Sequence, residues 1–151
     1  MHVLTLPWLR PYARYATLVL RVVVGLLMAM HGYAKLTGGA AGVAGFFGSL
    51  GIPAPGIMAW VVIIIELVGG IMIILGLFTR FWAFLYVPTM AVAIVLARMK
   101  SGIISPQGGT FTFELELALL AGALALALLG SGPMSLDHML GIDFHHEPEK
   151  A

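Results

Sequence analysis

The chain has 151 residues, of which 60% are hydrophobic and only 10% are charged. Soluble domains are nearer a quarter charged, so the composition excludes a water-soluble globule and indicates an integral membrane protein. The formal net charge is +1 and there are no cysteines. This charge provides no strong field for nucleic acid. The lack of thiols excludes disulfides, cysteine-ligated metals and haem attached through a C-x-x-C-H motif.

Residues 1–16 precede the first long apolar run. They combine two arginines with three aromatic residues: Arg10, Arg14, Trp8, Tyr12 and Tyr15. Basic and aromatic residues beside an apolar run are typical of the cytoplasmic headgroup layer, so we expect an interfacial, cytoplasmic segment. A cleaved signal peptide is the alternative. It is less favoured because no clean A-x-A site follows and the apolar run exceeds the ~7–15 residues of a signal-peptide core.

The first predicted helix spans residues 17–36 and carries Arg21, His31 and Lys35. A charge at the centre of a membrane helix costs on the order of 2.5–3.5 kcal/mol on insertion scales, so these groups need water, headgroups or partner side chains. Arg21 and Lys35 share one stripe with Gly25, Met28 and Gly32. The two cations are long enough to extend to opposite membrane surfaces, whereas His31 is too short to do so.

Three further apolar segments, residues 57–77, 81–97 and 113–130, complete a predicted all-α, polytopic four-helix bundle. Residues 37–56 are rich in glycine and proline and are expected to hold a short interfacial helix at 43–50, with Phe46, Phe47 and Leu50 in lipid. Pro88 predicts a kink in the third helix. We therefore divide the chain into a segment at 1–16, a four-helix membrane domain at 17–130 and a cytoplasmic tail at 131–151.

An even number of spans places both termini on one side of the membrane. Five basic residues fall on that side: Arg10, Arg14, Arg21, Arg80 and Lys150. Three fall on the other side: Lys35, Arg98 and Lys100. The positive-inside rule then predicts cytoplasmic termini. In the tail, Ser135 is expected to cap a short amphipathic turn. His145 and His146 are interpreted as part of a solvated tail, with metal binding as the alternative.

The ionisable groups gather in the outer half of the predicted bundle. At ~1.5 Å per residue, His31 lies roughly 7 Å and Glu66 roughly 13 Å from the outer ends of their helices. Glu66 shares a face with Gly69 and Gly70, which indicates that it points toward protein. Glu114 shares a face with alanines and Gly122 and is expected to point inward, while Glu116 reaches headgroups. For both acids, a favourable interaction with the helix dipole is the alternative explanation.

These positions predict a one-sided polar pocket rather than a channel, which would need polar residues through the full depth. The candidate pocket residues are His31, Lys35, Glu66 and Glu114, and the supporting charges are Arg21, Arg80 and Arg98. Glu66 is expected to pair with His31 or Lys35. Its protonation state and any catalytic role are left open, and no metal site is predicted.

The order and spacing of several short motifs resemble the DoxX family of small four-helix membrane proteins, from about Arg21 to Leu140. The motifs are RVVVG at 21–25, HGYAKL at 31–36, LGIP at 50–53, ELVGG at 66–70, LGLFTR at 75–80, Glu114 ahead of LG at 129–130, and SLD at 135–137. The family is named for a subunit associated with thiosulfate–quinone oxidoreductase and terminal quinol oxidase. The resemblance implies a four-helix fold in the inner membrane of a prokaryote.

Two main functional hypotheses follow. In the first, the chain is a membrane subunit of a quinone-linked oxidoreductase complex, in which His31 and Glu66 handle protons or hydrogen-bond a headgroup while Lys35 and Glu114 shape the pocket. In the second, it is a non-catalytic structural or assembly subunit whose charges connect helices. A small transporter is less favoured because the inner half is apolar.

The expected cofactors and partners follow from the same residues. No intrinsic cofactor is expected, since buried b-type haem commonly takes two histidines and only His31 is intramembrane; a quinone is the one candidate. The expected partners are the lipid bilayer and either other membrane or redox subunits or further copies of the chain. Nucleic acid is not an expected partner.

Overall fold

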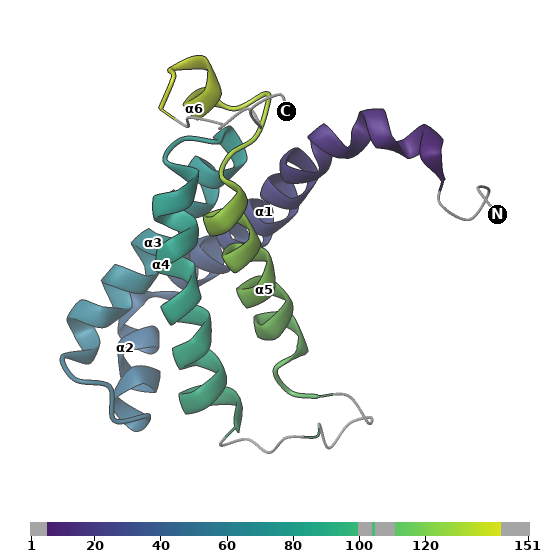
Figure 1. Ribbon diagram of the computed structural model, residues 1–151. Coiled ribbons are helices and arrows are strands. Elements are labelled where there is room, and N and C mark those ends of the chain that lie inside the picture. Colours follow the sequence, from purple (N-terminus) through teal and green to yellow (C-terminus); the bar gives the residue numbers. More distant parts are fainter. Residues whose placement is uncertain (1–5, 100–103, 105–110, 143–151) are drawn as a thin grey trace.

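A computed structural model of the protein describes residues 6–99, 104 and 111–142, and its elements are helical (Figure 1). In chain order they are the 3₁₀ helix η2 (Pro7–Tyr15), α1 (Ala16–Gly38), α2 (Ala40–Ser49), α3 (Pro55–Leu75), α4 (Thr79–Val92), the π-helix η3 (Ala93–Arg98), α5 (Glu114–Leu129) and α6 (Leu136–Met139). The predicted all-α class is confirmed. The expected tail histidines His145 and His146, and also Lys100 and Lys150, lie outside the described residues.

Helices α1 and α3 pack closely because glycines remove side chains from their crossing. A methyl group on Gly70 would lie 2.7 Å from the carbonyl oxygen of Gly25, and one on Gly32 would lie 2.8 Å from Cα of Leu67. Such distances leave no room for a larger residue. The small-residue stripe therefore fixes how α1 lies on α3, as is common at helix interfaces in membranes.

The hydrophobic core lies where α4 and α5 meet the α1–α3 pair. Its most buried side chains come from four helices: Met28, Ile73, Tyr86 and Leu126. Tyr86 donates its hydroxyl hydrogen to the backbone carbonyl of Glu66 at 3.2 Å. This hydrogen bond satisfies the buried hydroxyl group and joins α4 to the middle of α3.

A single arginine connects α1 to the segment after α5. Arg21 donates from Nη1 to the carbonyl of Ser131 and from Nη2 to that of Met134, each at 2.8 Å. The residue is 1% exposed. Arg21, which is long enough to extend toward headgroups, is instead bonded to these carbonyls. The carbonyls that follow α5 provide the acceptors that water would otherwise supply.

The turn between α3 and α4 is held by Asp137 of α6. Its two carboxylate oxygens accept the backbone N–H groups of Phe78 at 2.7 Å and Thr79 at 3.0 Å, and its own N–H donates to the carbonyl of Gly76 at 2.8 Å. Asp137 thus caps the N-terminus of α4, where a carboxylate also interacts favourably with the helix dipole. Ser135 accepts the N–H of His138 at 3.1 Å, as the predicted cap requires.

Three helical stretches in the described part of the chain are long and apolar enough to span a membrane: Trp8–Gly38, Pro55–Leu75 and Thr79–Arg98. The fourth, α5, has 16 residues. At ~1.5 Å per residue it measures about 24 Å, which is shorter than a hydrocarbon core of about 30 Å. The third helix stays α-helical through Pro88 to Val92 and then continues as the π-helix η3.

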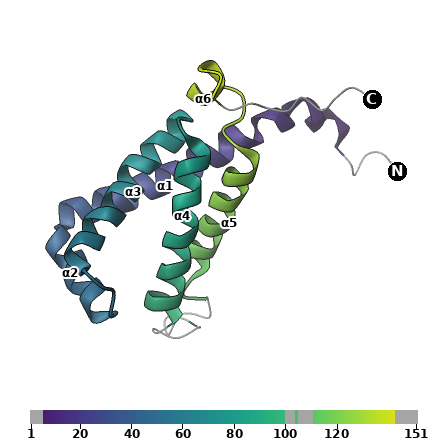
Figure 2. The ribbon, with the colours of Figure 1, turned by 60° about the vertical axis from the view of Figure 1, so that its left-hand side comes forward.

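The pair formed by α1 and α3 and the pair formed by α4 and α5 separate toward one end of the molecule. Helices η2 and α6 lie at the other end, so the described chain begins and finishes on the same side of the bundle (Figure 1). Figure 2 shows α3 and α2 diverging from α4 and α5 away from that end. We call the end with α6 the closed end and the end with α2 the open end. Which end faces the cytoplasm stays a prediction.

Candidate functional site

A cavity of about 930 Å³ lies toward the open end, between α1, α2 and α3 on one side and α4, η3 and α5 on the other. Its walls are mostly apolar and come from α1, α2, α3, α4, η3 and α5. Apolar lining residues include Met28, Phe46, Phe47, Ile65, Leu85 and Leu119. This volume is near the upper end of the range for small-molecule sites, about 300–1,000 Å³. Phe46 and Phe47 of α2 and Leu50, which follows α2, also line this cavity, and their expected contact with lipid stays a prediction.

An ion pair joins α1 to α3 at the cavity wall. Lys35 donates from Nζ to Oε1 of Glu66, and both residues line the cavity. The Glu66 side chain is only 3% exposed. Its other oxygen, Oε2, is buried and has no hydrogen-bond partner among the described residues. Of the two partners considered for Glu66, the structure selects Lys35.

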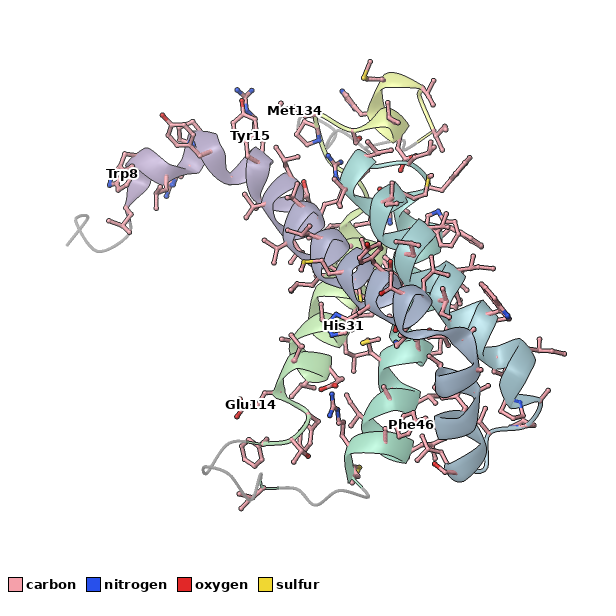
Figure 3. The ribbon with its side chains drawn as sticks, turned by 180° about the vertical axis from the view of Figure 1, so that it is seen from behind. Trp8, Tyr15, His31, Phe46, Glu114 and Met134 are labelled. Atoms are coloured by element: carbon pink, nitrogen blue, oxygen red, sulfur yellow. The ribbon has the colours of Figure 1, made fainter. Side chains whose placement is uncertain are left out.

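His31 also lines the cavity, one turn before Lys35 on α1. Figure 3 shows its side chain projecting from α1 on the side where α5 lies. The ring nitrogen Nδ1 is 2.8 Å from the carbonyl oxygen of Leu27. A carbonyl can only accept, so this contact assigns the proton to Nδ1. In the neutral ring, Nε2 is then a hydrogen-bond acceptor.

The two acids of α5 exchange the positions expected for them. Glu114 is exposed, accepts the N–H of Phe111 at 3.0 Å and is absent from the cavity wall; Figure 3 shows it on the outer side of α5. Glu116 lines the cavity instead. It accepts from Nε of Arg98 at 2.6 Å, and its side chain is 12% exposed. The expected inward position of Glu114 is therefore wrong.

The physical reason is the rotation of α5. Its buried residues are Leu119, Gly122, Ala123 and Leu126. Glu116 lies on the extension of this stripe, three residues before Leu119, whereas Glu114 does not. Apart from its two acids, α5 is apolar all round, so its sequence has no polar face that could have indicated the rotation.

The three supporting arginines divide between the two ends. Arg98 belongs to the cavity wall through its pair with Glu116. Arg80 donates to the carbonyls of Ala127 at 3.0 Å and Leu128 at 2.8 Å. It therefore covers acceptors at the C-terminus of α5, near the closed end, as Arg21 does for the segment that follows.

The cavity is thus lined by two ion pairs on separate helix contacts and by one histidine, among mostly apolar side chains. Within the described ranges, no group of three or more His, Asp or Glu side chains is placed to hold a metal ion. The available chemistry is hydrogen bonding and charge, offered to a largely apolar occupant. Such a site suits a small amphiphile with a polar ring or headgroup.

The fold and the apolar helices define a multi-pass helical membrane protein, with a partly open cavity between its helices. The family model described as DoxX matches residues 16–99, and the chain belongs to the DoxX family. The resemblance inferred from the short motifs is confirmed.

Similar proteins are known from several bacteria. A Bacillus subtilis (strain 168) protein named "Putative oxidoreductase CatD" is 36% identical over 121 residues, covering 80% of this chain and 84% of its own. The Escherichia coli (strain K12) inner membrane protein YphA is 30% identical over 124 residues, covering 80% and 86%. Inner membrane protein YqjF of the same organism is 30% identical over 123 residues, covering 82% and 90%. No solved structure gives a significant match to the chain.

Proposed function

We propose that the protein is a membrane subunit of a quinone-linked redox complex and that its cavity holds the quinone headgroup. The observation that carries this proposal is the Lys35–Glu66 pair, which lies with His31 in an otherwise apolar cavity. Apolar walls favour a ring and the start of an isoprenoid tail, while the polar groups hydrogen-bond the ring oxygens. The relative named as an oxidoreductase supports the same direction.

The roles of individual residues follow from their positions. Lys35 has three N–H donors, of which one meets Glu66; the others are available to a ring oxygen. Glu66 and His31 provide acceptors beside it. Arg98 and Glu116 form a second polar position on the α5 side of the cavity. The protein binds and orients the headgroup, and electrons pass through a partner subunit's cofactor.

The test is gentle purification in detergent followed by mass spectrometry of bound lipids and proteins. We expect a quinone at close to one molecule per chain, displaced by added short-chain ubiquinone. In Lys35→Met, which removes the donor offered to a ring oxygen, bound quinone should fall by about tenfold or more, the effect of losing one charged hydrogen bond. Protein without any bound or exchangeable quinone would refute the proposal.

Arg14→Met is the matched control, because it removes the same positive charge from an exposed residue outside the cavity. Its bound quinone should stay unchanged. Equal losses in Lys35→Met and Arg14→Met would show that the effect is a general consequence of removing a cation, and not of the cavity.

A structural or assembly role is the second candidate, and one observation favours it. The Lys35–Glu66 pair is also a contact between α1 and α3, so it can stabilise the bundle without binding anything. In that case Glu66→Gln should lower the amount of folded protein or of co-purified complex. A reproducible large complex without quinone would support this candidate.

A further inference from the structure

Helix α2 is a loosely packed wall of the cavity. None of its residues is buried, although Val43, Phe46 and Phe47 belong to the lining. A methyl group added to Gly42 or Gly45 would meet no neighbouring atom within 4 Å. A segment with few buried apolar contacts moves or opens locally at a low cost in free energy. We therefore expect α2 to move more easily than α1 and α3, which carry the core of the protein.

The polar contacts of α2 are local. Ser49 donates from Oγ to the carbonyl of Phe46 at 2.7 Å, and the N–H of Ile52 donates to the carbonyl of Phe47 at 3.1 Å. Among the described residues, no hydrogen bond or ion pair connects α2 to α4, η3 or α5. The two ion pairs of the cavity instead join α1 to α3 and η3 to α5. Apolar packing alone therefore holds α2 against its neighbours.

A glycine with positive φ stands at each end of α2. Gly39, between α1 and α2, has a φ of 95°, and Gly51, between α2 and α3, has a φ of 79°. Glycine adopts this region and the conformations around it without the steric cost that a side chain brings. Hinges in proteins are a few residues at the ends of elements that absorb changes in φ and ψ. The two junctions therefore allow α2 to turn as a unit while α1 and α3 stay in place.

The helices around α2 are fixed more firmly. The crossing of α1 and α3 leaves no room for a methyl group at Gly32 or Gly70, and the Tyr86 hydroxyl bonds α4 to the backbone of Glu66. Figure 2 shows α2 diverging from α4 and α5, and the cavity lies between these elements. A turn of α2 toward η3 narrows the cavity, and a turn away from η3 widens it.

Resting on the proposed function, we infer that α2 is a lid of the cavity. It turns about Gly39 and Gly51 toward η3 when a ligand is bound, and it brings Phe46 and Phe47 over the apolar part of the ligand. Closure excludes water from the polar lining, which strengthens the hydrogen bonds made there. When the cavity is empty, α2 returns outward and leaves the way in open.

The experiment measures the distance between two spin labels, which the absence of native cysteines makes straightforward. Ser49→Cys carries one label on α2 and Met99→Cys carries the other directly after η3; both positions are exposed. Pulsed electron paramagnetic resonance is recorded on the full chain in detergent, first depleted of quinone and then saturated with short-chain ubiquinone. We expect ubiquinone to shorten the mean distance by several ångströms and to narrow its distribution.

A second pair of labels is the matched control. Ile71→Cys on α3 and Leu128→Cys on α5 are also exposed, and they report on helices that do not take part in the closure of a lid. The distance between them should be the same with and without ubiquinone. Equal shortening in the two pairs would show that the two sides of the bundle move as whole bodies, and it would overturn the inference.

Hydrogen exchange of the unmodified protein makes the test independent of any variant. In the depleted protein, the amides of α2 should exchange faster than those of α3 around Gly70, because α2 has no buried residue. Ubiquinone should slow exchange in α2 more than in α3. Exchange in α2 that is as slow as in α3 before any ligand is added would contradict a mobile lid.

Bound ubiquinone is quantified in the same samples by mass spectrometry, which separates the inference from the proposed function. Bound ubiquinone together with an unchanged distance between the labels of Ser49→Cys and Met99→Cys overturns the lid and leaves the proposed function standing. Absence of any bound ubiquinone overturns the proposed function and the lid with it.

Discussion

Arg21 is a charged residue inside a membrane helix whose cost is met by backbone carbonyls. Both acceptors, Ser131 and Met134, follow α5 in the chain. Sequence reasoning identified Arg21 as a charge that needs partners. It could not identify those partners, because they lie 110 and 113 residues away and carry no side-chain signature of an acceptor.

Replacing Arg21 should destabilise the protein. Arg21→Met keeps a long apolar stem but leaves two carbonyls without donors, and hydrogen bonds to charged groups contribute about 1.5–3 kcal/mol each. We expect a clear fall in the unfolding temperature, measured by size-exclusion chromatography of heated detergent samples. Arg14→Met removes an arginine that is exposed and should leave this temperature nearly unchanged. An equally stable Arg21→Met protein would show that the interaction is dispensable.

Asp137 gives a graded version of the same test. The aspartate accepts two N–H groups at the start of α4. Asparagine retains one acceptor and alanine retains none, so stability should decrease in the order Asp, Asn, Ala. Loss of a capping side chain typically costs about 0.5–2 kcal/mol, and burial places the Ala variant at the upper end. Identical unfolding temperatures for Asp137→Asn and Asp137→Ala would contradict the two-acceptor geometry.

At the scale of elements, the sequence predicted the inward face of a helix correctly where small residues mark that face beside a charge. The α1 stripe was identified because Gly25 and Gly32 occur at helical spacing beside charges, and both are buried. The Glu66 face of α3 was identified by the same logic from Gly69 and Gly70. The same logic failed in helix α5, where the alanines and Gly122 on the face of Glu114 suggested that Glu114 points inward, whereas Glu116 lines the cavity and Glu114 is exposed.

The α2 helix shows that the sequence cannot decide what surrounds an apolar side chain. Its phenylalanines were predicted to enter lipid, and the structure adds that Phe46 and Phe47 line the cavity. An apolar side chain is equally compatible with acyl chains and with an apolar cavity wall, so composition alone cannot distinguish them. The distinction depends on tertiary packing of α2 against α3, which the local sequence does not encode.

The close crossing of α1 and α3 can be tested at one glycine. A methyl group on Gly70 would meet the Gly25 carbonyl oxygen at 2.7 Å, and backbone atoms cannot move aside cheaply. Gly70→Ala should therefore cost about 1–3 kcal/mol, as overpacking does. Gly42→Ala in α2 is the control, because nothing lies within 4 Å of the added methyl group. Its stability should stay level or rise slightly, since alanine favours helices.

For the whole molecule, the closed and open ends have different chemistry. At the closed end, Arg21, Arg80 and Asp137 are each bonded to backbone groups of other elements. At the open end, the ion pairs Lys35–Glu66 and Arg98–Glu116 line a cavity. The closed end thus fixes the helices with respect to one another, and the open end is where a ligand can be received.

The orientation of these ends decides from which leaflet a ligand enters. The positive-inside rule predicts that the closed end faces the cytoplasm, because the arginines of η2 and Arg80 at the start of α4 lie there. Since the chain has no cysteine, single thiols can report the orientation without background. Ser49→Cys marks the exposed end of α2, and Met139→Cys marks α6 at the closed end.

In right-side-out membrane vesicles, a membrane-impermeant maleimide should label Ser49→Cys directly and Met139→Cys only after the vesicles are opened. The reason is that each thiol is exposed at the surface of its own end, so access depends only on the side of the membrane. Labelling of Met139→Cys alone would place the cavity on the cytoplasmic side. The proposed quinone would then have to reach Lys35 from the inner leaflet.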